Sequence, residues 1–237
     1  MRKAFQSRIP VRERICTIKL APFSFNKLSL GLYRNTVNPP LDASTQGDLL
    51  RELRRDYPSL TQIPNGVLFA DPAKGRAMII DPTHVEASEN SPHVAPSALE
   101  HLANDVRVAV PIIDFAPPFR VRVEGTGTIQ ALEGVDPADV LLGYAPPQPG
   151  WNDIGGRCTH SCVRYLFTAE NGVQRDVHIE PLFAQPDKFY VMVVSMNSGL
   201  GVDTLETAMQ QAHDEVDVIE RLSNRIVADI VSGATPE

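Results

Sequence analysis

Residues 203–233 read DTLETAMQQAHDEVDVIERLSNRIVADIVSG, and this stretch carries the most regular pattern in the chain. Apolar or small residues recur at alternating spacings of four and three, which places them on one face of a helix. They are Leu205, Met209, Ala212, Val216, Ile219, Ser223, Ile226 and Ile230. Gly233 follows the last of them, and glycine often ends a helix because it adopts left-handed backbone geometry without strain. The pattern predicts a C-terminal helix roughly 45 Å long.

Two interpretations of this apolar seam stay open. In the first, the seam packs on the protein's own sheet, as one face of a helix in a globular domain usually does. In the second, part of the seam pairs with a second subunit in a homo-dimer, because heptad spacing also supports coiled-coil contacts. The candidate interface residues are then Leu205, Met209, Val216, Ile219, Ile226 and Ile230.

The rest of the chain shows strand and helix patterns in turn. Alternation of apolar and polar residues predicts strands over 23–34, 66–70, 76–80, 119–131, 159–168, 174–183 and 188–196. Helical spacing with capping or proline signals predicts helices over 44–57, 97–111 and 136–145. Asn171 and Gly172 predict a hairpin turn, and residues 88–96 are predicted to form a loop.

This order predicts an α+β fold with antiparallel sheets packed against helices. Strand, short helix, antiparallel strands and longer helix follow one another twice, which is consistent with two pseudo-repeated units. An internal duplication and a chance succession of elements both produce this order. The predicted organisation is a basic N-terminal arm at 1–20, a first α+β half at 21–116 and a second half at 117–237 with the long helix.

The charge is distributed unevenly along the chain. The net charge is −7, yet residues 1–19 hold six basic side chains against the single acidic Glu13, a net of +5, so the remainder carries −12. An acidic protein of this kind does not bind nucleic acid with its whole surface. Residues 2–19 are predicted either to contact nucleic acid, a membrane surface or an acidic partner, or to be a solvated tail or lie on the protein's own acidic face.

Composition and cysteine content narrow the class of protein. With 43% hydrophobic and 22% charged residues, the chain is neither disordered throughout nor of low complexity. Three cysteines, an odd number, argue against a disulfide framework. No apolar run is long enough to cross a membrane. We therefore expect a cytoplasmic protein without a membrane span.

Cys158, His160 and Cys162 are candidate metal ligands because thiolate and imidazole groups bind zinc. They fall, however, in a segment predicted to be a strand. Alternate residues of a regular strand are separated by nearly 7 Å, by roughly 3.3 Å per residue, which is too far for one tetrahedral site. A pair of free thiols is the alternative interpretation.

Asp176, His178 and Glu180 are the candidate ligand-binding residues, since they share one face of a predicted strand. Two carboxylates beside an imidazole can transfer protons. The same pattern also fits the solvated face of a half-buried sheet. No nucleotide-binding, hydrolase or kinase motif is present, so we expect no cofactor.

The sequence favours a non-enzymatic binding or assembly protein that acts as an oligomer, with itself or another protein as partner. The alternatives are a small-ligand-binding protein or enzyme with a cleft between sheet and helices, and a protein that contacts nucleic acid through its basic arm.

Several short motifs carry a resemblance to a known family. They are the opening strand after Ala21 and Pro22, the helix end at Tyr57 and Pro58, and the strand Phe189–Met196, which leads into a helix containing Ala212 and His213. Through them the chain resembles a sporadically distributed family of uncharacterised bacterial proteins of similar length. The resemblance implies two pseudo-repeated α+β units and transfers no functional residues.

Overall fold

The computed structural model describes residues 20–35, 39–148, 158–197, 199 and 201–233. Apart from Leu20, the predicted basic arm lies outside these residues. The described residues form nine strands and four helices. The strands are β1 (Ser24–Tyr33), β2 (Ser59–Ile63), β3 (Gly66–Asp71), β4 (Arg76–Ile80), β5 (His84–Asn90), β6 (Arg120–Gln130), β7 (Val163–Thr168), β8 (Val173–Pro181) and β9 (Lys188–Asn197). The helices are α1 (Ala43–Leu53), α2 (Ala95–Ile112), α3 (Pro137–Tyr144) and α5 (Leu205–Ser232).

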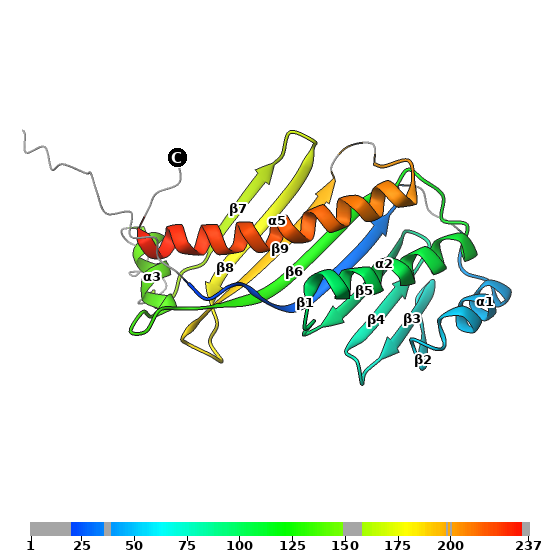
Figure 1. Cartoon of the computed structure of the whole chain (residues 1–237), viewed down its shortest axis with the longest axis horizontal. Coiled ribbons are helices and arrows are strands. Elements are labelled where there is room, and N and C mark those ends of the chain that lie inside the picture. The colour runs from blue at the N-terminus through cyan, green and yellow to red at the C-terminus, as the bar shows by residue number, and fades with distance from the viewer. Residues whose placement is uncertain (1–19, 36–38, 149–157, 198, 200, 234–237) are drawn as a thin grey trace, which may run out of the picture.

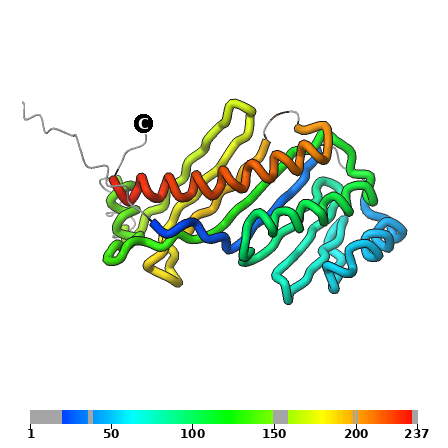
Figure 2. Tube along the Cα trace, in the orientation of Figure 1, coloured from blue at the N-terminus to red at the C-terminus, as the bar shows by residue number. Residues whose placement is uncertain are grey.

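All nine strands belong to one antiparallel sheet in the order β2-β3-β4-β5-β1-β6-β9-β8-β7 (Figure 1). The α+β prediction is confirmed, but the described strands form one sheet, whereas the sequence predicts more than one antiparallel sheet. The halves are joined where β1 pairs with β6, two strands that run side by side although they are far apart in the chain (Figure 2). This pairing satisfies the backbone groups of two strands that would otherwise be sheet edges.

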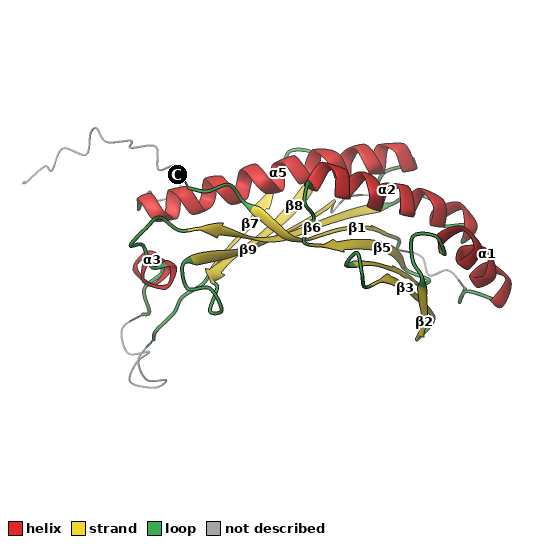
Figure 3. Cartoon of the chain, turned by 60° about the horizontal axis from the view of Figure 1, so that its bottom comes forward, coloured by secondary structure: helices red, strands yellow, loops and turns green. Residues whose placement is uncertain are grey.

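The two longest helices, α2 and α5, lie over the same face of the sheet (Figure 3). Helix α2 packs on β5 and β1, whereas α5 packs on β6 and β9. The core between the layers includes Leu28, Leu30 and Leu32 of β1, none of which is exposed. Gly125 of β6 lets α5 approach closely, because a Cβ added there would lie 2.9 Å from Cγ2 of Ile219.

The apolar seam of the C-terminal helix packs inside this same chain. Met209, Val216, Ile219 and Ile230 are buried in the core beneath α5, and Leu205 and Ile226 are partly buried against it. The structure therefore has the first of the two predicted arrangements. The chain's own sheet covers Met209, Val216, Ile219 and Ile230, whereas Leu205 and Ile226 stay partly exposed, and a homo-dimer contact stays a prediction.

The ends of α5 show how local sequence sets a helix boundary. Thr204 is the N-cap, and its side-chain oxygen accepts a hydrogen bond from the backbone N–H of Thr207 at 3.1 Å. At the other end Gly233 has a φ of 70°, in the left-handed region, as the sequence predicts.

Several predicted boundaries are wrong. Strands β2 and β5 are missed by the sequence pattern, and β5 occupies part of the predicted loop at 88–96. Helix α1 ends at Leu53 instead of Tyr57, although the N–H of Tyr57 still donates to the carbonyl oxygen of Leu53 at 2.9 Å. Among the described residues, no helix combines the length and apolar character needed to cross a membrane.

Candidate binding surface on the uncovered face of the sheet

We call the face of the sheet opposite α2 and α5 the open face. Successive side chains of a strand point to opposite faces, so the open face is lined by the residues that alternate with the core positions. Its half-buried apolar members form two flanks, Leu68 and Ile79 on one side and Met192, Val194 and Met196 on the other. The sheet bends away from the helix layer towards β2, which makes the open face concave at that end (Figure 3).

The centre of the open face carries a cluster of charged groups, which we call the central charge cluster. Lys27 and Tyr33 come from β1, Glu86 from β5, and Arg122 and Glu124 from β6. Nη1 of Arg122 lies 3.2 Å from Oε2 of Glu86, its Nη2 donates to Glu124, and Nζ of Lys27 lies 3.6 Å from Oε1 of Glu124. Two cations therefore neutralise two carboxylates.

Within this cluster, Tyr33 of β1 contacts two residues of β5. Its hydroxyl donates a 2.5 Å hydrogen bond to Oε2 of Glu86, and its ring stacks on that of His84 with 5.0 Å between centroids. Burial, and then the adjacent Glu86 carboxylate, raise the pKa of Tyr33 above its usual value. The protonated hydroxyl donates to Glu86, so the cluster is held together by contacts within the single chain.

Electrostatics also fix the charge state of Arg122. Burial acts to lower the pKa of its guanidinium, but the carboxylates of Glu124 and Glu86 outweigh this effect and raise the pKa overall. Ser29 lies on β1 between Ser88 and Glu124, and its buried hydroxyl oxygen has no hydrogen-bond partner among the described residues.

The predicted ligand-binding residues Asp176, His178 and Glu180 lie on β8, with side chains on the open face. Arg164 of β7 donates two hydrogen bonds to Asp176, at 2.9 and 2.6 Å, and this contact lowers the pKa of Asp176. Nε2 of His178 lies 3.2 Å from Oδ1 of Asp176, and Glu180 is exposed. The three residues point away from the helices, so they do not line a cleft between sheet and helices.

Cys158, His160 and Cys162 precede β7 and do not lie on a strand, contrary to the prediction. Sγ of Cys158 donates to the backbone oxygen of His160 at 3.3 Å. The His160 ring packs edge-on against Phe183, with centroids 4.8 Å apart. Within the part of the chain that the structure describes, no group of three or more His, Cys, Asp or Glu side chains is arranged to hold a metal ion.

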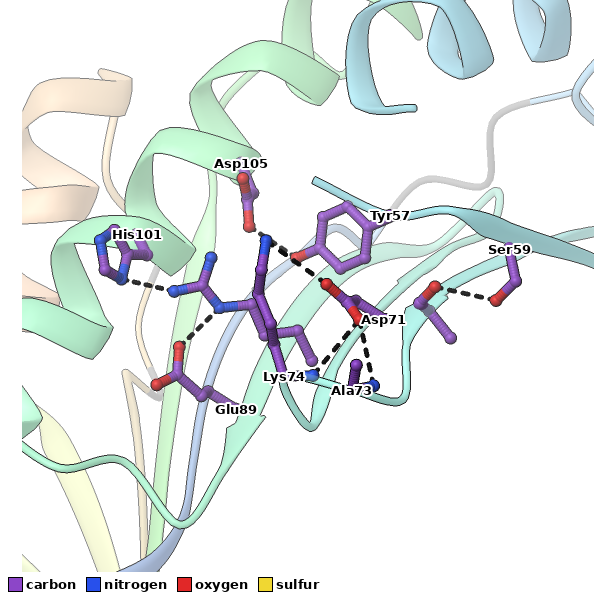
Figure 4. Close-up of polar contacts among 10 residues, drawn as sticks. Tyr57, Ser59, Asp71, Ala73, Lys74, Glu89, His101 and Asp105 are labelled. Atoms are coloured by element: carbon purple, nitrogen blue, oxygen red, sulfur yellow. Dashed lines mark hydrogen bonds and ion pairs between the residues drawn. The ribbon is translucent and has the colours of Figure 1, made fainter. Parts of the chain in front are cut away.

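A polar cluster that the sequence did not predict lies beneath α2 (Figure 4). The hydroxyl of Tyr57, which is fully buried, donates a 2.5 Å hydrogen bond to Oδ2 of Asp105. Burial raises the pKa of Asp105, although the Tyr57 hydrogen bond acts to lower it. Nearby, Arg76 contacts Glu89 at 2.8 Å and Nδ1 of His101 at 2.5 Å.

A second buried cluster lies beneath α5. Nε and Nη2 of Arg175 donate to the two carboxylate oxygens of Glu215, at 2.8 and 2.7 Å. The hydroxyl of Ser195 donates to the same carboxylate at 2.6 Å. These contacts satisfy the charge of Glu215, whose side chain is only 4% exposed.

One sequence signal could have located both buried carboxylates. Asp105 falls between Leu102 and Val106, within the apolar stripe of its helix, and Glu215 lies beside the seam of the C-terminal helix, three residues after Ala212 and four before Ile219. A charged residue in an apolar stripe indicates a buried polar contact, since an unpaired charge in a core is strongly unfavourable.

No family model matches this sequence, and no curated protein matches it.

Proposed function

We propose that the chain is a non-enzymatic binding or assembly protein, and that its open face takes up the surface of a partner protein. The observation that carries the proposal is the asymmetry of the sheet. The helix layer packs on one face, whereas the other presents two apolar flanks around a neutral, internally paired charge cluster.

The fixed geometry of this face favours binding. Its side chains stand on a regular sheet, and those of the central charge cluster are already held by one another. These side chains would therefore lose little conformational freedom when a partner binds. The ordering of interface side chains is one of the main free-energy costs of association. Burial of the apolar flanks would supply the favourable free energy that offsets the cost of association. The charge pattern would orient the partner.

Site-specific photo-crosslinking in cell extract tests the proposal. A photoreactive amino acid at Val194 of the open face is expected to give a discrete adduct with another protein. The matched control is Gln210, an exposed position on α5. Met192→Lys should abolish the Val194 adduct, while Glu206→Lys on α5 should leave it intact. Equal adducts from both positions, or no adduct, would contradict the proposal.

We also propose that the two halves are pseudo-repeats. In the first half the order is β1, α1, β2 to β5 and α2; in the second it is β6, α3, β7 to β9 and α5. The first strand of each half pairs with the last strand of that half, as β1 with β5 and β6 with β9. Each long helix also buries one carboxylate against the sheet, which supports a common origin.

Small-ligand binding is a second candidate function, favoured by a cavity of about 380 Å³ at the β7 end of the sheet. Leu166, Thr168, Asp176, Val194 and Met196 contribute to its lining. The test is a screen of a small-molecule library by thermal unfolding. A compound that raises the melting temperature of the wild type, but not that of Val194→Trp, would support this function. Nucleic-acid contact through residues 2–19 and cytoplasmic location stay predictions.

A further inference from the structure

The edge strand β7 is apolar, and among the described residues no further strand pairs with its outer side. Leu166 is 73% exposed and its neighbour Phe167 is 37% exposed. The other edge strand, β2, is five residues long and is flanked by Pro58 and Pro64. Short length and proline are common means of preventing edge-to-edge pairing. β7 contains no proline.

The backbone of β7 offers three residues for further pairing. The N–H of Ala169 donates to the carbonyl oxygen of Val173 at 2.8 Å, which marks a hydrogen-bonded pair between the strands. Such pairs recur at every second residue of an antiparallel ladder. Val163, Tyr165 and Phe167 therefore direct their backbone groups to β8. The N–H and C=O groups of Arg164, Leu166 and Thr168 point away from the sheet.

We propose that two copies of this chain pair through β7, antiparallel, so that one sheet continues into the other with Leu166 opposite Leu166 of the second copy. The two-fold axis then passes between these two residues, perpendicular to the sheet. Arg164 lies opposite Thr168 of the second copy, and all three outward-facing residues gain hydrogen-bonded partners.

Side chains select this register over its neighbours. A two-fold axis at Arg164 would place two guanidinium groups directly opposite, which is unfavourable. An axis at Thr168 would leave Arg164 beyond the end of the partner strand. An axis at Tyr165 would pair Arg164 with Leu166 but leave Thr168 beyond the end of the partner strand, and an axis at Phe167 would pair Leu166 with Thr168 but leave Arg164 beyond it. Only the axis at Leu166 gives all three outward-facing residues a partner. In the proposed register Tyr165 lies opposite Phe167 of the second copy, and aromatic cross-strand pairs are favourable.

The ring arrangement within one copy supports this pairing. Tyr165 and Phe167 already lie with centroids 6.0 Å apart on the helix side of β7. Arg164 is the only charged residue of the strand, and it is held by Asp176 of its own copy. The dimer interface therefore brings no like charges into opposition, and it covers the most exposed large apolar side chain among the described residues.

Light scattering after size-exclusion chromatography tests the association. The full-length chain is expected to elute at twice its mass of 26.0 kDa. Leu166→Lys should reduce this to the mass of one chain, because two ammonium groups would meet at the axis. Phe183→Lys is the matched control, since Phe183 is 70% exposed but lies outside β7. It should remain dimeric, and circular dichroism should show both variants folded.

Disulfide trapping tests the register. In a background with Cys16, Cys158 and Cys162 replaced by serine, Leu166→Cys should form a covalent dimer on mild oxidation. Directly opposed residues have Cα atoms about 5.5 Å apart, within disulfide range. Thr168→Cys should not form one, because the two Thr168 positions lie four residues apart along the strands, roughly 14 Å at 3.4 Å per residue.

Three outcomes would overturn the proposal. They are a monomeric wild type at micromolar concentration, a dimer that Leu166→Lys does not weaken, and equal trapping of the two cysteine variants. A β7 edge that instead receives a strand from a different protein would give the first of these outcomes.

Discussion

Each of the two long helices buries one carboxylate against the sheet, but the two carboxylates have different partners. Asp105 on α2 accepts a hydrogen bond from the neutral hydroxyl of Tyr57. Glu215 on α5 accepts two from the guanidinium of Arg175 and one from the hydroxyl of Ser195. With its carboxyl group ionised, the Tyr57–Asp105 contact has a net charge of one negative unit. In the Arg175–Glu215 contact the two opposite charges cancel.

The difference determines what happens when a contact is broken. A carboxyl group can take up a proton when it loses a partner, and burial has already raised the pKa of Asp105 towards that outcome. A guanidinium group cannot lose its charge in a protein. The pair beneath α5 is therefore the less tolerant of the two to the loss of one member.

The largest effect is expected from breaking the pair beneath α5. Glu215→Leu leaves the Arg175 guanidinium as a buried charge without its carboxylate, and such changes typically cost about 3–5 kcal/mol in free energy of unfolding. The double variant Arg175→Met, Glu215→Leu removes both charges and should recover most of this loss. Urea unfolding of the three proteins measures it. A single variant as stable as the wild type would show that solvent reaches the pair.

A smaller effect is expected beneath α2. Tyr57→Phe removes the hydroxyl that donates to Asp105, and an unsatisfied buried polar group costs about 1–3 kcal/mol. The control is Tyr33→Phe, because Glu86 keeps its contact with Arg122 when the Tyr33 hydroxyl is lost. Urea unfolding should rank the loss for Tyr57→Phe above that for Tyr33→Phe. The reverse order would contradict the role assigned to Asp105.

The pH dependence separates the two clusters further. Because the pKa of Asp105 is raised in the folded state, the folded protein binds more protons than the unfolded chain between the ordinary aspartate pKa and the raised value. Stability contributed by Asp105 therefore falls as pH rises through this window. The wild type should lose stability relative to Asp105→Asn as pH increases from 4 upwards. Unfolding free energies measured at successive pH values should show this trend, and a difference that stays constant would contradict it.

The parts of this fold that were predictable from sequence are those with regular local patterns. The four-three spacing predicted α5, strict alternation predicted β6, and Asn171 with Gly172 predicted the hairpin between β7 and β8. Strand β5 was missed because its apolar positions, Val85 and Ala87, are few and small. A short pattern of this kind cannot be distinguished from a loop without knowing what covers it.

The contacts between distant segments were not predictable. Tyr57 and Asp105 are 48 residues apart, and Arg175 and Glu215 are 40 apart, so each pair is brought together only by tertiary packing. Tyr57, in the connection between α1 and β2, meets α2, and Arg175 of β8 meets α5. The joining of β1 to β6 is equally non-local. Local spacing does predict that Asp176, His178 and Glu180 share a face. It does not predict that the guanidinium of Arg164 donates hydrogen bonds to the carboxylate of Asp176.

The smallest effect is expected from a second arginine–carboxylate contact, one that differs from the α5 pair chiefly in burial. Arg164 contacts Asp176 with two hydrogen bonds, as Arg175 does Glu215, but its side chain is 58% exposed against 13% for Arg175. In water the attraction is weak and both groups are well solvated when separated. Arg164→Ala should therefore leave the urea midpoint unchanged within error, at low and at high salt. A loss approaching that of Glu215→Leu would mean that contact geometry, rather than burial, sets the strength of these pairs.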